Sequence, residues 1–291
     1  WAASLFVANA YPMKNQNMPK RVFAPAAEDA AQAKKAISTP QTEHPAYKLA
    51  FQDEKFLLRE DLRPVRFQLE LLKPELLLDE AKIGSTFVMY GSARIPAPGV
   101  MSGHENPNVA KSLEAKSHYY DEARALAQTV SQVPPDADGT RQFVICSGGG
   151  PSIMEAANRG ASDVGAESIG LNIVLPHEQA PNQYVTPGLR FQFHYFALRK
   201  MHFLLRARAV AVFPGGFGTF DEMFELLTLI QTGKIKAIPV ILFGKSFWGR
   251  VVNFEALVEE GVISARDLDL IHLVETAEEA WAIVQKFYET R

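Results

Sequence analysis

The sequence predicts an α/β fold, a Rossmann-like doubly wound parallel sheet with an N-terminal helical extension. After residue 84, short and continuously apolar runs recur along the chain, and helix-length stretches lie between most of them. Apolar strands that alternate with helices are typical of a parallel sheet that is buried on both faces. The runs are TFVMYG, QFVICSGGG, IGLNIVLP, FQFHYF, AVAVFPGG, PVILFG and LIHLVE.

The part of the chain before the sheet divides into two segments. Residues 1–45 are rich in Lys, Gln, Ala and Pro without sustained periodicity, which indicates a loosely ordered arm. Residues 46–83 carry Leu-rich segments interrupted by Pro64 and Pro74, where we expect helices to end or kink. We therefore expect short amphipathic helices over 46–83 that pack on the core or on another subunit. A single domain then covers residues 84–291.

The sheet domain is expected to contain helices at 111–133, 152–164, 197–208, 219–231 and 247–260. In a doubly wound sheet, ligands bind at the carboxyl ends of the strands. The residues that directly follow each apolar run are therefore the candidates for function.

Two glycine-rich loops follow such runs and share one design. SGGGPS occupies residues 147–152, PGGFGT occupies residues 214–219, and a helical pattern follows each loop. Glycine lets the backbone approach a ligand closely, and a helix N-terminus directs N–H groups at an anion. The two loops therefore predict a phosphate site. The candidate binding residues are Gly149, Gly150, Gly215, Gly216, Phe217, Gly218 and Thr219.

Each loop is followed by a glutamate for which two explanations exist. Ser152 and Glu155, like Thr219 and Glu222, have the spacing of a capping box, in which the glutamate only stabilises the start of a helix. Alternatively, a carboxylate beside the sugar of a bound nucleotide stabilises an oxocarbenium-like transition state or orients water, as in glycoside hydrolysis. Capping is the favoured explanation for Glu155, and the catalytic role is favoured for Glu222.

Two adjacent cations, Arg199 and Lys200, lie at the start of the helical segment after the FQFHYF run. Arg199 offers a bidentate fork for phosphate or ribose oxygens, and Lys200 offers a point charge. For either residue alone, a solvated cation on a helix surface would be the favoured explanation. Their position directly after a predicted strand makes both of them candidates for the site.

Composition argues against several classes of partner. The 30 Lys and Arg residues against 33 Asp and Glu give a net charge of −3, so nucleic acid and anionic membranes are not expected partners. No apolar stretch reaches the roughly 18 residues of a membrane-spanning helix. The single cysteine, Cys146, indicates a core position and a reducing, cytoplasmic location. The seven histidines lack metal-ligand spacing, and no metal is expected.

The residues around Glu222 carry a resemblance to a known family. PGGFGTFDE at 214–222 matches the PGGxGTxxE motif of the LONELY GUY (LOG) family, and Arg199 and Lys200 fall where that family has its Arg-Lys pair. The likeness extends over roughly residues 86–288 and includes GGGPSIMEAANRGA at 148–161, which is typical of longer members. The chain therefore resembles a longer, bacterial-type member of this family.

This resemblance implies a nucleotide-binding hydrolase that acts on the N-glycosidic bond of cytokinin riboside 5′-monophosphate, and often of AMP. The products are the free base and ribose 5-phosphate, and no cofactor is required. The resemblance implies Glu222 and Arg199 as the catalytic pair, with Lys200, Glu178 and Thr228 also around the substrate. It also implies a homo-oligomer, a dimer or larger.

Two questions stay open at this level. Met201, Phe203 and the loop at 94–109 differ from the short plant-like members, so the preferred base is not defined. The alternative function is a non-catalytic nucleotide sensor or carrier of the same fold, in which Glu222 is a cap or a sugar contact. Many family members carry an older lysine decarboxylase label, but nothing in the sequence independently indicates a pyridoxal phosphate lysine.

Overall fold

The computed structural model describes residues 23–176 and 180–290. These residues form two compact units, which divide between residues 66 and 67. The division falls inside the segment for which the sequence predicts a helical extension.

The smaller unit consists of short helical segments joined by turns. None of its described residues, 23–66, is buried. Helices of this length are marginal without tertiary packing. The segments are α1 (Ala26–Ala33), α2 (Pro40–Glu43), η1 (Pro45–Tyr47), η2 (Ala50–Gln52), α3 (Glu54–Leu57) and η3 (Glu60–Leu62), and α4 (Arg63–Glu80) begins at the end of this unit.

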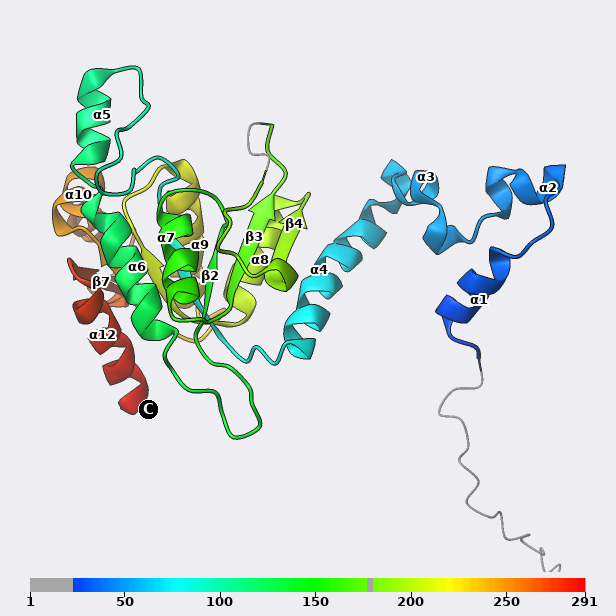
Figure 1. The fold of residues 1–291 in the computed structure, drawn as a ribbon. Helices are drawn as coiled ribbons and strands as arrows, with labels where there is room; N and C mark the ends of the chain where they lie inside the picture. Colours follow the sequence, from blue (N-terminus) through cyan, green and yellow to red (C-terminus); the bar gives the residue numbers. More distant parts are fainter. Residues whose placement is uncertain (1–22, 177–179, 291) are drawn as a thin grey trace, which may run out of the picture. The chain divides into compact units, whose positions relative to one another are not determined.

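The larger unit is built on a sheet of seven strands in the order β4-β3-β2-β1-β5-β6-β7, and every strand pair is parallel. Each of the apolar runs predicted from the sequence overlaps one of these strands (Figure 1). The strands are β1 (Thr86–Tyr90), β2 (Val144–Ser147), β3 (Ser168–Ile173), β4 (Arg190–Phe193), β5 (Ala207–Val212), β6 (Val240–Phe243) and β7 (Ile271–Val274).

Helices cover both faces of this sheet, so the predicted doubly wound α/β fold is confirmed. Along β1, Phe87 and Met89 pack into a core with α6, α7 and α12, whereas Val88 and Tyr90 pack into a second core with α4, α8 and α9. Burial on both faces explains why the strands are continuously apolar rather than alternating. The helices of this unit are α5 (Pro107–Glu114), α6 (His118–Val130), α7 (Ile153–Asp163), α8 (Phe196–Leu205), α9 (Phe217–Gln231), α10 (Lys245–Val251), α11 (Phe254–Glu259) and α12 (Ala277–Glu289), with η4 (Pro187–Leu189) and η5 (Ala265–Leu270).

Three helix predictions differ from the structure. The single helix expected at 247–260 is two helices, α10 and α11. The single helix expected at 111–133 is two helices, α5 and α6, separated by a turn at residues 115–117. Helix α4 does not end at Pro74, because it runs on to Glu80. Pro64, by contrast, lies in the first turn of α4, where a missing N–H removes no helical hydrogen bond.

The order of the strands places a topological switch point beside β1. From β1 the chain moves outward through β2, β3 and β4, and it then crosses to β5 on the other side of β1. The loops that follow β1 and β5 therefore lead in opposite directions and leave a crevice between them, which is where doubly wound sheets bind ligands.

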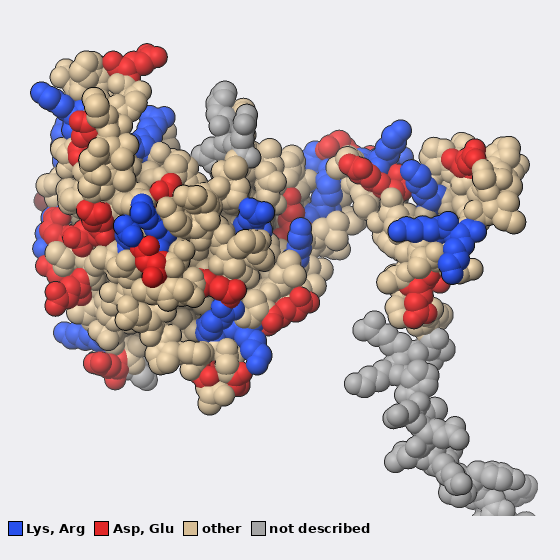
Figure 2. Space-filling view, in the orientation of Figure 1, with Lys and Arg blue, Asp and Glu red and all other residues tan. Residues whose placement is uncertain are grey.

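The surface charge and the position of the cysteine agree with what the composition of the protein predicts. On the visible face of the larger unit, basic and acidic side chains are interspersed (Figure 2). Cys146 is buried in the core, as expected. Among the described residues, no helix is long and apolar enough to span a membrane.

Candidate functional site

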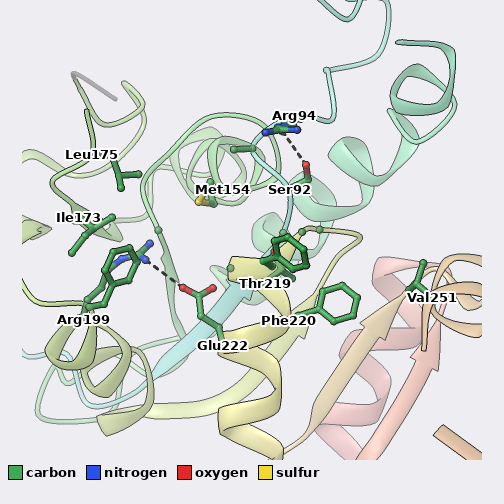
Figure 3. A pocket seen from close by; sticks show the side chains of 18 of the residues that line it. Ser92, Arg94, Met154, Ile173, Leu175, Arg199, Thr219, Phe220, Glu222 and Val251 are labelled. Carbon is green, nitrogen blue, oxygen red and sulfur yellow. Dashed lines mark hydrogen bonds and ion pairs between the residues drawn. The ribbon is translucent and has the colours of Figure 1, made fainter. Parts of the chain in front are cut away.

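A cavity of about 920 Å³ opens at the carboxyl ends of β1 and β5, at the switch point. It is lined by both strand-end loops, by Gly148 after β2, and by side chains of α8, α9 and α10 (Figure 3). Among the residues predicted from the sequence, Gly215 to Thr219, Arg199 and Glu222 all lie in this lining.

The loop at 214–219 forms one wall of the cavity. Helix α9 begins at Phe217, with Gly216 as its N-cap residue in an extended conformation. A Cβ atom on Gly215 would lie 2.1 Å from Thr219 Oγ1, so only glycine fits the tight approach of the loop to the helix. The N–H groups of the first turn of α9 lack helical partners and are available to an anion.

The start of α9 argues against the capping explanation for Glu222. The N-cap is Gly216 and Thr219 is the third helical residue, so Thr219 and Glu222 do not form the capping box that their spacing suggests. Glu222 lies in the second turn, and its carboxylate is directed at Arg199 (Figure 3). Capping therefore does not account for this carboxylate.

Arg199 and Glu222 form a largely buried ion pair inside the cavity. The distance from Arg199 Nη1 to Glu222 Oε1 is 3.4 Å, and the two side chains are only 11% and 14% exposed. Arg199 Nε also donates to the carbonyl oxygen of Leu171, at 2.7 Å, which fixes the guanidinium. Burial raises the pKa of Glu222 to about 7, although the charge of Arg199 acts in the opposite direction.

Gly148 makes room for this guanidinium. A Cβ atom at residue 148 would lie 2.7 Å from Arg199 Nη2 and 2.7 Å from Met154 Sδ. The glycine-rich loop at 147–152 therefore contributes to the site mainly by allowing Arg199 to approach the backbone.

Gly149 and Gly150, predicted as binding residues, are not among the residues that line the cavity. Their loop is held by other side chains, because Asn182 Nδ2 donates to the carbonyl oxygen of Gly150 at 3.0 Å. A Cβ atom on Gly149 would lie 2.5 Å from Asn172 Oδ1. Close packing inside the protein, rather than approach to a ligand, explains Gly149.

The capping box expected after this loop is also not formed. Ser152 is the N-cap residue of α7, but its side chain makes no cap hydrogen bond. Its Oγ donates instead to the carbonyl oxygen of Ile95, at 2.5 Å. Glu155 accepts a hydrogen bond of 2.7 Å from the Tyr120 hydroxyl.

Three other predicted residues lie apart from the cavity or are not described. Lys200 Nζ pairs with Asp221 at 2.9 Å and with Glu225 at 3.1 Å, and Lys200 does not line the cavity. Thr228 is exposed, and its Oγ1 donates to the carbonyl oxygen of Phe224 at 2.7 Å. Glu178 lies outside the described residues.

Helix α8, which carries Arg199, is held in place by α4. The two carboxylate oxygens of Glu70 accept hydrogen bonds from the backbone N–H groups of His194, at 2.8 Å, and Tyr195, at 3.2 Å, directly before α8. A carboxylate at this position satisfies unpaired donors and complements the helix dipole.

A second contact between the same helices results from Pro74. Proline lacks the N–H that would bond the carbonyl oxygen four residues earlier, that of Glu70. His202 Nε2 takes this place and donates to Glu70 O at 3.0 Å, which explains why α4 continues through its proline. Burial lowers the pKa of His202, in agreement with a neutral ring.

The sequence prediction missed two groups of lining residues. Ser92 and Arg94 follow β1, where the rule that function follows each apolar run could have found them. An apolar wall contributed by several helices had no signal in the sequence, because its members are scattered along the chain. It includes Met154, Phe196, Phe220, Phe247 and Val251.

Comparison with known proteins gives a family match and several relatives. Residues 154–284 match the family model described as "Possible lysine decarboxylase". The Arabidopsis thaliana protein "Cytokinin riboside 5′-monophosphate phosphoribohydrolase LOG2" is 27% identical over 154 residues, which cover 52% of this chain and 67% of that relative.

Two solved structures are also similar. The X-ray structure of the structural-genomics target TM1055 is 21% identical, with a TM-score of 0.46, and the match covers 69% of this chain and 99% of that one. The Moco carrier protein from Chlamydomonas reinhardtii is 18% identical, with a TM-score of 0.42, and the match covers 71% of this chain and 99% of that one.

Proposed function

Because the sequence comparisons confirm the predicted resemblance to LOG proteins, we propose that this protein hydrolyses the N-glycosidic bond of a nucleoside 5′-monophosphate. The observation that carries the proposal is the buried pair of Glu222 and Arg199, which lies in the same cavity as the N-terminus of α9. An anion-binding helix N-terminus next to a buried carboxylate suits a substrate with a phosphate at one end and a reacting sugar carbon at the other.

In the proposed reaction, the phosphate binds at the N–H groups of the 214–219 loop and the sugar lies beside Glu222. The C1′–N bond breaks, and its electron pair leaves with the base. Water supplies a hydroxyl group to C1′ and a proton to the released base. The Glu222 carboxylate stabilises the positive charge that develops on the sugar or accepts the proton of the attacking water. Arg199 holds this carboxylate in place and favours its ionised form.

The apolar wall is the proposed contact surface for the base. Phe220, Phe247 and Val251 offer faces on which a purine or an apolar substituent would pack. Cytokinin riboside 5′-monophosphate and AMP are the first substrates to assay, and measuring base release across a panel of nucleoside monophosphates identifies the preferred base.

The chemistry of the cavity does not suit a lysine decarboxylase. A pyridoxal phosphate enzyme needs a lysine that forms a Schiff base with the cofactor. No lysine is found among the described residues that line the cavity, and the Lys200 ammonium is held by Asp221 and Glu225. The side chains of the cavity therefore do not support the description "Possible lysine decarboxylase".

Hydrolysis should depend strongly on the 5′-phosphate of the substrate. We expect kcat/KM for AMP to exceed that for adenosine by more than about tenfold, the effect of at least one charge-assisted hydrogen bond. The reason is that binding energy at the phosphate positions C1′ for reaction. Release of the free base, measured by chromatography with each substrate, checks this.

Two controls complete the comparison. Adenosine with added ribose 5-phosphate shows whether the phosphate must be attached to the nucleoside. Equal rates on AMP and adenosine would contradict phosphate anchoring. Tight binding of AMP without release of adenine would indicate a carrier or sensor instead of an enzyme.

We also propose that the protein forms a homodimer or a larger oligomer through α4. On α4, three leucines are exposed: Leu69 by 52%, Leu72 by 51% and Leu76 by 56%. Their spacing of three and four residues places them on one face of the helix. A row of exposed leucines on a helix is typical of a contact with another helix.

Light scattering of the eluting protein should give at least twice the mass of one chain. Leu72→Glu should reduce this mass, because it places a charge in the apolar row. The matched control is Val262→Glu, since Val262 is 66% exposed and lies outside α4. An active wild-type protein that has the mass of a single chain would refute the oligomer.

A cytoplasmic location is proposed as well. It is supported by the lone Cys146, which is buried and has no cysteine with which to form an intrachain disulfide.

A further inference from the structure

We infer that Arg94, in the loop after β1, is the side chain that binds the phosphate of the substrate. This inference rests on the proposed function and adds to it a residue for which neither the sequence motifs nor the comparisons indicate a role.

The two cations predicted for the site are already neutralised. A phosphate monoester carries a charge of roughly −1.5 to −2 near neutral pH. Arg199 is paired with Glu222 and bonded to the carbonyl oxygen of Leu171. Lys200 is paired with Asp221 and Glu225 and does not line the cavity. Neither cation therefore has its charge available for a dianion.

Arg94 is the remaining cation of the cavity. Of the described residues that line it, only Arg94 and Arg199 carry a positive charge. In contrast to Arg199, Arg94 is exposed, and no described carboxylate lies within ion-pair distance of it. Its guanidinium therefore has its full set of donors available for a bidentate contact with phosphate oxygens.

The position of Arg94 matches the proposed phosphate position. The backbone N–H of Ser92 donates to Pro214 O at 3.0 Å, which joins the β1 loop to the glycine-rich loop. The Arg94 N–H then donates to Ser92 Oγ at 3.0 Å, which fixes the turn. Figure 3 shows Arg94 across the cavity from the pair of Arg199 and Glu222.

This arrangement gives the cavity two chemically distinct ends. Arg94 presents positive charge across the cavity from the ion pair, and the N-terminus of α9 presents N–H donors to the same cavity (Figure 3). A nucleotide whose phosphate lies between Arg94 and the α9 N-terminus has its sugar directed at Glu222. Arg94 thus determines selection for phosphorylated substrates, and Glu222 acts on the bond that breaks.

The test compares Arg94→Gln and Arg94→Lys with wild type on AMP and on adenosine. Loss of one charged contact should lower kcat/KM for AMP about tenfold to hundredfold in Arg94→Gln, mainly through KM. The slow rate on adenosine should fall much less than the rate on AMP, because adenosine lacks the phosphate that Arg94 would contact. Arg94→Lys should recover part of the loss, since lysine keeps the charge but not the fork. The control is Arg208→Gln, an exposed arginine on β5 that does not line the cavity.

Binding measurements separate this inference from the proposed function. Calorimetry with AMP should show weaker binding to Arg94→Gln than to wild type, whether or not the base is released. If wild type binds AMP but releases no base, the proposed function fails, and the calorimetric comparison alone decides the role of Arg94. If Arg94→Gln matches wild type in AMP affinity and in kcat/KM, the inference is overturned while the hydrolase remains.

Discussion

Glu222→Gln should lower kcat on the best nucleoside monophosphate by about two to four orders of magnitude, the usual effect of removing a general base or an essential charge. Gln has the size of Glu and keeps an oxygen that can accept from Arg199, so the substrate should still bind. What it lacks is the negative charge that would face the sugar. Base release under saturating AMP, together with calorimetric affinity for AMP, measures the two effects separately.

The matched control for this substitution is Glu155→Gln. Glu155 follows the other glycine-rich loop at the corresponding position, but its carboxylate accepts from Tyr120 and does not line the cavity. Both variants should have circular dichroism spectra close to that of wild type. If Glu222→Gln turns over at nearly the wild-type rate, the proposed mechanism is wrong.

Activity should rise with pH up to about 7 and then level off. Burial raises the pKa of Glu222 to about 7, and the ionised carboxylate is the form that the mechanism requires. Two pH units below this pKa about 1% of the carboxylate is ionised, so kcat/KM at pH 5 should be roughly a hundredfold below its plateau. The measurement is kcat/KM from pH 5 to 9 on the wild-type protein.

The second ionisation of the substrate phosphate lies near pH 6, so the assignment to Glu222 needs a direct probe. Carbon NMR of protein labelled in its glutamate carboxyls should show one resonance that titrates near 7 and is missing from Glu222→Gln. The free energy of unfolding of wild type, relative to that of Glu222→Gln, should fall over the pH range in which activity rises. A raised pKa in the folded state means that stability is present at low pH and is lost as pH rises through about 7. Activity that falls as pH rises would identify the protonated acid as the active form and contradict the role proposed for the carboxylate.

The sequence was sufficient to predict the sheet because its signal is local. Each strand is a short apolar run, and the alternation with helices requires a parallel sheet covered on both faces. The proline in α4 shows where local signals fail. Pro74 predicts a break, but the helix continues because His202, more than a hundred residues away, supplies the missing donor to Glu70 O.

The site was predictable as a set of loops but not residue by residue. Arg199 and Lys200 are adjacent in the sequence, yet neighbouring positions on a helix point about 100° apart, so Arg199 faces the cavity and Lys200 faces Asp221. The spacing of Thr219 and Glu222 suggests a capping box, but α9 begins earlier, at Phe217. The position of this start depends on the extended backbone of Gly216, which the spacing does not reveal. Of the glycines at 148–150, only Gly148 lines the cavity. This depends on tertiary packing against Arg199 and Asn172, which the sequence does not show.

The contacts of Glu70 and His202 have a consequence for how short an active form of this protein can be. A fragment trimmed to the first strand, at Thr86, would keep every residue that lines the cavity. It would nevertheless expose the backbone N–H groups of His194 and Tyr195, which Glu70 satisfies, at the start of the helix that carries Arg199. The shortest fragment that keeps this contact therefore begins no later than Glu70, inside the larger unit. We expect a protein truncated at the sheet to lose the alignment of its ion pair while retaining all of its cavity residues.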